Sequence, residues 1–404
     1  MDETRSAFTR LRGLLDGVAA PEGRAAIELH LGESRMAPPA VDVTPLADVD
    51  GWTRYPPLGG TAELRAAYSG WLQRRFTGRH SPHDLPIATE PTPGAKQALA
   101  VAIALAARER DAGAPAVIMP NPFYPTYRTA AAAAGARPVY YTLDTPDGVA
   151  PIAAAVEAAG GRAAAIILCT PGNPRGDILP AAAMGKVAEI AAAAGALLIV
   201  DEVYTDLALR RTPPGYLSLV AEEQGAPGRF LVVHSLSKRS AMPGLRSGFV
   251  AGDPATVAAY AAYNRSCGVS TPLPVTTVAA RLWDDDDHIE GLRAALARNW
   301  QLADATLGGV YGYRRAEAGF FLWLPVADDE ETAVGLWRDQ GVRVMPGRYL
   351  AAETDDGTNP GAGHVRVALV HEATTMREGL TRLRHALLSS SSLRGPPREQ
   401  RAGR

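Results

Sequence analysis

The sequence predicts an α/β protein with a large, mostly parallel sheet flanked by helices, together with a smaller α+β domain. Short runs that are apolar on both faces alternate with helical stretches in the middle of the chain. This alternation is typical of parallel sheets that are covered on both sides. Beyond about Thr276 the order changes to helices followed by alternating strands. The 404 residues, 47% of them hydrophobic, suffice for two domains with sizeable cores.

Each element is bounded by turn residues or by a change of periodicity. In the middle of the chain, helices are predicted over Pro180–Ala194 and over Gln97–Arg108, the second opened by Gly94-Ala95-Lys96. Helix Ile289–Leu307 precedes strands Gly319–Leu324 and His364–Leu369 in the last part. The buried strands predicted in the middle of the chain are Ala116–Met119, Ala163–Cys169, Ala196–Val200 and Phe230–Val233.

These elements suggest a division of the chain. We expect residues 1–50 to form an N-terminal arm and part of the small domain, and residues 51–280 to form the large domain. Residues 281–388 should complete the small domain. Residues 389–404 have no apolar pattern and are expected to be a disordered tail.

Composition excludes several classes of protein. A net charge of −2 argues against a nucleic-acid binder, and the two cysteines argue against a disulfide scaffold. The N-terminus is not a secretory signal and no apolar run reaches the ~18 residues of a membrane span, so a soluble, cytoplasmic protein is expected. The acidic run Asp284–Asp287 before His288 is interpreted as a solvated helix start, and no metal site is predicted.

Chemically active side chains follow the predicted strands. Ligands of such sheets bind beyond the carboxyl ends of the strands, so these side chains should share one edge. The segments at those ends carry an aromatic ring, an amide, a carboxylate, a phenol and a lysine. They are PNPFYP (120–125), TPGNP (170–174), DEVY (201–204) and HSLSK (234–238).

The lysine segment suggests an aldehyde cofactor. Lys238 can form a Schiff base while Ser235, Ser237 and Arg246 hold a phosphate. Asp201 can keep a pyridine nitrogen protonated. Taken alone, the segment fits a surface lysine beside a serine-rich turn better, and Asp201 has an ordinary reading as a helix cap.

Four further groups would complete such a site. Tyr204 and Asn173 could reach the ring hydroxyl, Tyr124 could stack on the ring, and the helix start at Ala95 and Lys96 could bind the phosphate. Each has an ordinary reading as packing, a turn or a helix start. Their joint placement at strand ends favours pyridoxal 5′-phosphate.

The same residues carry a family resemblance. From about Ile27 to Leu387 the chain resembles the class I/II aminotransferases of pyridoxal-phosphate fold type I. The motifs are LGE (31–33), YPPLGGTAELR (55–65), PNPFYPTY (120–127), PGNPRG (171–176), VDEVY (200–204), SLSKRSAMPGLRSGFVAGD (235–253), GFFLWL (319–324) and HVRVALV (364–370).

The resemblance implies a role for each candidate. Lys238 would be the Schiff-base lysine and proton carrier, and Asp201 would pair with the pyridine nitrogen. Arg366 would clamp the substrate α-carboxylate, with Gly32 and Asn173 lining the same pocket. Tyr55 would reach the phosphate of a neighbouring subunit, which implies a homodimer. The remaining cofactor contacts would be Ala95, Lys96, Tyr124, Asn173, Tyr204, Ser235, Ser237 and Arg246.

A narrower resemblance concerns the substrate. Four stretches are similar to the proteobacterial N-succinyldiaminopimelate aminotransferases, which use glutamate as amino donor in lysine biosynthesis. They are RYPP (54–57), PNPFY (120–124), HSLSKRSAMPGLRSGFVAGD (234–253) and the run 347–370. Arg175 and Arg128 depart from that pattern, where threonine and glutamate are expected. The cations that could read a distal carboxylate are Arg35, Arg54, Arg175 and Arg343.

Other functions remain open at this stage. A general aspartate-, alanine- or aromatic-type aminotransferase is the main alternative, and a lyase of the same fold is another. An aminotransferase-like sensory domain would need a DNA-binding module before Ile27. A binding protein without catalysis would not need both Lys238 and Asp201.

Overall fold

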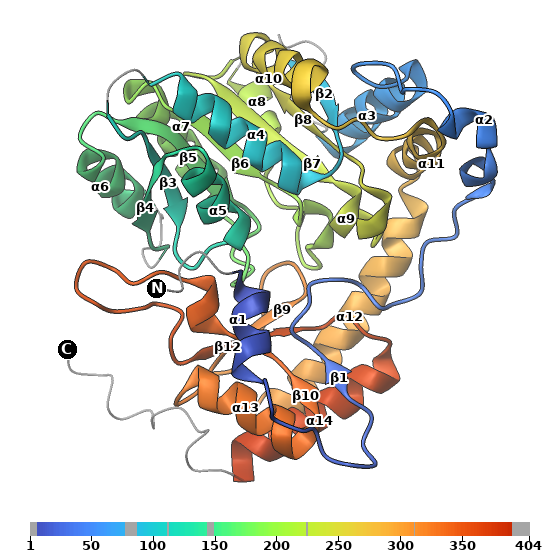
Figure 1. The fold of residues 1–404 in the computed structure, drawn as a ribbon, viewed down its shortest axis with the longest axis vertical. Helices are drawn as coiled ribbons and strands as arrows, with labels where there is room; N and C mark the ends of the chain where they lie inside the picture. The colour runs from blue at the N-terminus through green and yellow to red at the C-terminus, as the bar shows by residue number, and fades with distance from the viewer. Residues whose placement is uncertain are drawn as a thin grey trace.

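The computed structural model describes residues 6–76, 87–110, 113–143, 149–223, 225–310 and 312–389. The large sheet and its helices occupy the upper half of Figure 1, and two smaller sheets with their helices occupy the lower half. No helix in these ranges is long and apolar enough to cross a membrane.

Seven strands form the large sheet within the described ranges, in the order β2-β8-β7-β6-β5-β3-β4. Neighbours from β7 to β4 are parallel, whereas β8 runs antiparallel to both β7 and β2. The predicted α/β fold class is therefore confirmed. The strands are β2 (Ala88–Thr92), β3 (Ala116–Pro120), β4 (Arg137–Tyr141), β5 (Ala163–Cys169), β6 (Leu197–Asp201), β7 (Phe230–Ser235) and β8 (Gly248–Gly252).

Helices cover both faces of this sheet because its strands are apolar on both sides. One hydrophobic cluster joins the sheet to α4 (Ala95–Arg108), α5 (Pro125–Ala133) and α10 (Pro254–Cys267). The cluster on the other face includes α3 (Ala62–Arg75), α6 (Ala150–Ala158), α7 (Ala181–Ala193), α8 (Tyr216–Glu222) and α11 (Leu273–Asp284). The short elements of this half are η1 (Thr44–Ala47), α2 (Val49–Trp52), η3 (Thr205–Leu207), α9 (Leu236–Arg239) and η4 (Pro243–Leu245).

The smaller sheets join the two ends of the chain. Strand β1 (Ile27–Glu28) pairs in parallel with β10 (Val342–Arg343). Strand β12 (His364–Ala368) lies antiparallel between β11 (Met345–Pro346) and β9 (Phe321–Pro325). The surrounding helices are α1 (Ala7–Leu14), α12 (Asp287–Leu307), α13 (Asp329–Gln340), η5 (Gly347–Leu350) and α14 (Ala373–Ser389).

The hydrophobic clusters suggest where the domains meet. One large cluster draws on Leu64 to Trp283, whereas another combines Ile27 and Leu29 with residues 296–387 and only two residues of the large half. We propose on this grouping that the large domain ends near α11 and that the N-terminal strand belongs to the small domain.

Several element ends differ from the sequence prediction by one or two residues. The strand expected from Gly319 begins at Phe321, because Gly319 has φ +77° and turns the chain before the strand starts. Ser389, expected as the first residue of the tail, is instead the last residue of α14. Residues 390–404 of that tail lie outside the described residues.

A buried acid lies beneath the strand ends. Glu202 and His234 are almost fully buried, and their side chains approach to 3.6 Å. Burial raises the pKa of Glu202 to about 7 and lowers that of His234 to about 3. A protonated Glu202 facing a neutral His234 therefore fits this site better than two charges.

This pair predicts a pH-dependent stability. The carboxyl of Glu202 has a raised pKa in the fold, so its stabilising protonated form is lost as pH rises through about 7. Between about pH 5 and about pH 8 the parent should lose up to about 3 kcal/mol of unfolding free energy that Glu202→Gln retains. Denaturant titration at both pH values measures this. The exposed Glu189→Gln is the control, and a variant that tracks the parent at both pH values would contradict the prediction.

Candidate active site

A cavity of about 450 Å³ opens where the carboxyl ends of the large-sheet strands face the small sheet. Its volume lies within the usual range for small-molecule sites. With the exception of Tyr55, all the predicted site residues line it. They are Gly32, Ala95, Lys96, Tyr124, Asn173, Asp201, Tyr204, Ser235, Ser237, Lys238, Arg246 and Arg366.

Lys238 projects into this cavity from α9. This short helix follows β7 directly, and the Ser235 side chain caps it by accepting from the Ser237 backbone N–H. Lys238 Nζ donates to the Gly32 carbonyl and lies 5.4 Å from the Phe320 ring centroid. Burial, and then the nearby Arg366, lower the pKa of Lys238 to about 8. The fraction of uncharged amine, about a tenth at pH 7, is therefore far larger than that of an ordinary lysine, as a nucleophile or base requires.

Asp201 ends β6 and is 2% exposed. Its Oδ2 accepts a 2.6 Å hydrogen bond from the Tyr127 hydroxyl, and its Oδ1 accepts from the Val203 backbone N–H at 3.3 Å. Burial raises the pKa of Asp201 to about 6, against the opposing effect of these bonds and of Lys238. A cationic nitrogen bound against this carboxylate would be strongly held.

Arg366 is buried on β12 at the opposite wall. Its two terminal nitrogens donate to Asn173 Oδ1 at 3.1 Å and to the His30 carbonyl at 3.0 Å, while its Nε has no hydrogen-bond partner. Its guanidinium carbon lies 4.2 Å from the centroid of the Phe321 ring. Burial lowers its pKa to about 10, and no carboxylate of the described residues forms an ion pair with it. A buried guanidinium of this kind suits a carboxylate ligand.

The amide of Asn173 joins the two sides of the cavity. Its Nδ2 donates to the Tyr204 hydroxyl at 3.4 Å while its Oδ1 accepts from Arg366. The amide is held between Gly172 and Pro174, in the turn after β5. One amide thus orients a phenol and a guanidinium toward the same space.

Small hydroxyls and a cation form an anion cup beside Lys238. The hydroxyls of Ser235 and Ser237 are 3.0 Å apart, and Arg246 lies 3.5 Å from the second. Arg246 has left-handed backbone angles, φ 56° and ψ 52°. Its guanidinium donates a hydrogen bond to the carbonyl of Pro93 at 2.8 Å. Gly94 has φ +96°, a conformation that favours glycine at the start of α4, and a Cβ there would also displace this guanidinium. The N-terminus of α4, the hydroxyls and the cation fit a phosphate group.

Gly32 and Tyr124 shape the walls. A Cβ on Gly32 would lie 2.6 Å from the Phe321 ring, so only glycine allows this close approach. Tyr124 precedes α5 and contacts Tyr127 edge to face, with ring centroids 5.6 Å apart. Tyr55 does not line the cavity and its side chain is fully exposed.

The sequence analysis missed several residues that line or support the cavity. Tyr127 belongs to the PNPFYPTY motif, and its position one turn after Tyr124 in α5 is the signal that could have identified it. Glu33, Cys169 and Phe321 also line the cavity. Of these, Glu33 lies in the LGE motif and Cys169 at the end of β5.

The two departures from the family pattern lie outside the cavity lining. Arg128 packs over Phe123, with 5.2 Å between its guanidinium carbon and the ring centroid. Arg175 pairs with Asp177 at 2.9 Å and lines a neighbouring cavity of about 360 Å³. Of the other candidate cations, Arg35 pairs with Glu33 and Arg343 with Glu28.

A pyridoxal-phosphate enzyme needs a lysine, a carboxylate and a phosphate-binding site close together. This cavity provides Lys238 and Asp201 at neighbouring strand ends, with the anion cup beside them. Residues 28–383 match the sequence model of the family described as aminotransferase class I and II. The chain belongs to this family, as its motifs predicted, and is a pyridoxal-phosphate-dependent aminotransferase.

Individual relatives have different substrates. The chain is 31% identical to the 4-dedimethylamino-4-oxo-anhydrotetracycline transaminase OxyQ of Streptomyces rimosus, over 87% of this chain and 90% of that protein. It is 30% identical to the probable N-succinyldiaminopimelate aminotransferase DapC of Mycobacterium tuberculosis, over 73% and 74% of the two chains. An aminotransferase structure from Neisseria meningitidis superposes with a TM-score of 0.85 at 31% identity, over 94% and 96%.

The Tyr127–Asp201 bond predicts how cofactor affinity depends on pH. Because the Tyr127 hydroxyl lowers the pKa of Asp201, Tyr127→Phe should raise that pKa and leave the carboxyl more protonated near neutrality. Affinity for pyridoxal phosphate at about pH 7 should fall roughly tenfold. As the pH is lowered, the affinity of the variant should also begin to decrease at a higher pH than that of the parent. Equilibrium binding followed by absorbance measures both.

Tyr141→Phe is the matched control for this experiment. Tyr141 is also a buried tyrosine, but its hydroxyl donates to the Ile167 carbonyl and does not contact Asp201. Equal losses of affinity in the two variants would contradict the assigned role of Tyr127.

Proposed function

We propose that this aminotransferase moves an amino group between glutamate and N-succinyl-LL-diaminopimelate, with Arg366 as the α-carboxylate clamp. The observation that carries the proposal is the buried Arg366, whose Nε has no hydrogen-bond partner and whose other nitrogens are oriented by Asn173 and His30. A carboxylate can supply the missing acceptor in a bidentate geometry. Both substrates carry an α-carboxylate beside the amino group that is transferred.

The residues of the cavity divide the chemical work. Pyridoxal phosphate, when bound, supplies a conjugated ring that accepts electrons from the substrate α-carbon. As a free amine, Lys238 would remove and return the α-proton, and its lowered pKa of about 8 suits that task. Asp201 holds a proton on the ring nitrogen, and Asn173 and Tyr204 orient the ring hydroxyl. Ser235, Ser237, Arg246, Ala95 and Lys96 hold the phosphate.

Two observations support the succinylated substrate. The lysine segment and RYPP (54–57) are similar to the N-succinyldiaminopimelate enzymes, and the probable N-succinyldiaminopimelate aminotransferase DapC is a relative at 30% identity. The OxyQ relative acts on a fused-ring ketone by its printed name and matches more of the chain. A broader aminotransferase therefore remains the second candidate.

A homodimer is part of the proposal. Tyr55 is fully exposed, although its motif assigns it to a phosphate site. Other large apolar side chains are also exposed, four of them close to Tyr55 in the chain and one, Val269, lining the same surface pocket as Leu58. Exposed apolar side chains grouped in this way are typical of a surface that a second subunit covers. They are Val43, Val49, Trp52, Leu58 and Val269.

The dimer also offers a cation for the distal carboxylate. None of Arg35, Arg54, Arg175 and Arg343 lines the cavity of their own chain. Arg54 adjoins Tyr55 in the exposed segment, so a second copy that delivers Tyr55 would bring Arg54 with it. We propose Arg54 as the group that reads the succinyl or distal carboxylate.

Single half-reactions test the substrate. Glutamate and N-succinyl-LL-diaminopimelate should each convert the bound pyridoxal form to the pyridoxamine form, seen as loss of its visible absorbance band. Arg54→Gln should lose the reaction with the succinylated compound and keep most of the reaction with alanine, which has no distal carboxylate. Conversion by glutamate alone would discard the succinylated substrate and retain a general aminotransferase.

Removing the lysine tests the reaction itself. Lys238→Ala should lower the rate of amino transfer by at least about 10⁴-fold, because no other group removes the α-proton. The exposed Lys186→Ala on α7 serves as the control and should match the parent. Circular dichroism and thermal unfolding check that both variants fold. Appreciable turnover by folded Lys238→Ala would overturn the role of Lys238.

A further inference from the structure

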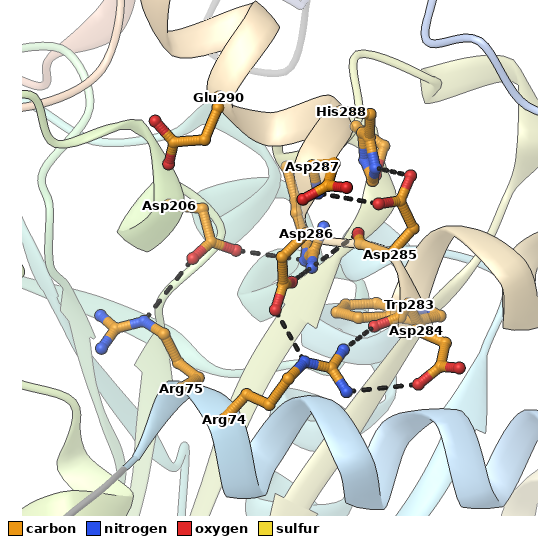
Figure 2. A network of polar contacts seen from close by, with 12 residues as sticks. Arg74, Arg75, Asp206, Trp283, Asp284, Asp285, Asp286, Asp287, His288 and Glu290 are labelled. Carbon is orange, nitrogen blue, oxygen red and sulfur yellow. Dashed lines mark hydrogen bonds and ion pairs between the residues drawn. The ribbon is translucent and has the colours of Figure 1, made fainter.

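The acidic run Asp284–Asp287 is largely exposed and leads into α12, as the sequence predicted, but three of its carboxylates also pair with basic side chains. Figure 2 shows Asp284 and Asp286 pointing toward Arg74, and Asp285 pointing toward His288. Arg239 donates to Asp286 and lies 3.3 Å from Asp206. The run therefore contacts Arg74, Arg239 and His288.

Two of these contacts reach the segment that carries Lys238. Arg239 is the next residue, and its guanidinium also lies 3.4 Å from the Asp285 carbonyl. Ser240 follows, and its hydroxyl is 2.8 Å from His288 Nε2. The residues immediately after Lys238 are thus fixed by side chains and a carbonyl of the linker 285–288.

Arg239 is a costly group to bury. It is 2% exposed, and its guanidinium carbon lies 5.9 Å and 5.6 Å from the ring centroids of Trp71 and Trp283. A cation in such surroundings is stable only with its carboxylate partners, here Asp206 and Asp286. The ion pairs therefore fix where this side chain can lie.

Helix α9 has little stability of its own. It has four residues, and so short a helix needs tertiary contacts to persist. Lys238 and Arg239 are consecutive on it and point in different directions, one into the cavity and the other into the ion pairs. Any shift of Arg239 moves the attachment point of Lys238.

The linker also leads toward Arg366. It opens α12, which runs from the large half to the small sheet in Figure 1. Farther along α12, Asn299 donates to the Leu369 carbonyl at 3.1 Å, and Trp300 donates to the Gly319 carbonyl at 3.0 Å. These carbonyls adjoin the strands β12 and β9, the first of which carries Arg366.

We propose that Arg239, held by Asp206 and Asp286, is the positioning residue for Lys238. Through α12, the linker 285–288 then sets the distance between Lys238 and Arg366. This inference rests on the proposed function of both residues. It assigns Arg239 no contact with substrate or cofactor.

Two neighbouring substitutions test the proposal. Asp286→Asn removes a carboxylate that binds Arg239, whereas the control Asp284→Asn removes one that pairs with Arg74 alone. The first readout is the pH dependence of Lys238 acylation in the cofactor-free protein, followed by mass spectrometry. Asp286→Asn should raise the pH midpoint of Lys238 acylation by about half a pH unit or more, because a Lys238 that is less firmly held is better hydrated. Asp284→Asn should leave it unchanged.

The second readout is steady-state kinetics of the holoenzyme. Asp286→Asn should lower kcat by about 10-fold to 100-fold, because small displacements of a reacting group are costly, while KM for glutamate stays within about twofold. Arg239→Lys should retain more of kcat than Arg239→Met, since it keeps the charge. Folding of each variant is checked by circular dichroism.

The outcomes separate the two proposals. If Asp286→Asn matches Asp284→Asn in both readouts, the positioning role is wrong. If the parent neither binds pyridoxal phosphate at Lys238 nor turns over, the proposed function is wrong, and the acylation midpoints still decide the role of Arg239. Should Asp286→Asn fail to fold, the comparison of Arg239→Lys with Arg239→Met decides it.

Discussion

An excess of positive charge around one cavity is the constraint on which the site depends. Lys238, Arg246 and Arg366 line one cavity together with the single buried carboxylate of Asp201. Positive charge at low dielectric lowers the pKa of its neighbours and favours anions. Burial and then Arg366 lower the pKa of Lys238, while the unpartnered Nε of Arg366 and the anion cup at Arg246 each leave a positive group facing the cavity. A phosphate and a carboxylate relieve this excess.

The fold creates this condition by bringing strand ends together. Parallel pairing of β5, β6 and β7 brings Asn173, Asp201 and Lys238 to one edge of the large sheet. The antiparallel β9 and β12 face that edge with Phe321 and Arg366. Asp201 and Arg366 are almost fully buried, so the charges of these two groups must be satisfied from within the cavity.

The sequence could predict what depends on local pattern, such as apolar strands followed by polar residues. That rule was enough to locate Asp201, Lys238 and their neighbours, and the family motifs added Arg366. It could not predict the Tyr127–Asp201 bond or the ion pairs of Asp286, because these join residues 74 and 47 positions apart in the chain. An acidic run has the same pattern whether it faces water or a buried arginine, and only tertiary structure distinguishes the two.

Helix α12 has a further consequence for how the protein can vary. It is a 21-residue helix fixed near one end by the contacts of Asp286 and His288 and farther along by those of Asn299 and Trp300. Each residue inserted or deleted between these points would rotate one set of contacts against the other by about 100°. The segment between Glu290 and Arg298 should therefore accept substitutions on its exposed face. It should not accept insertions or deletions, because these would rotate the two sets of contacts relative to each other.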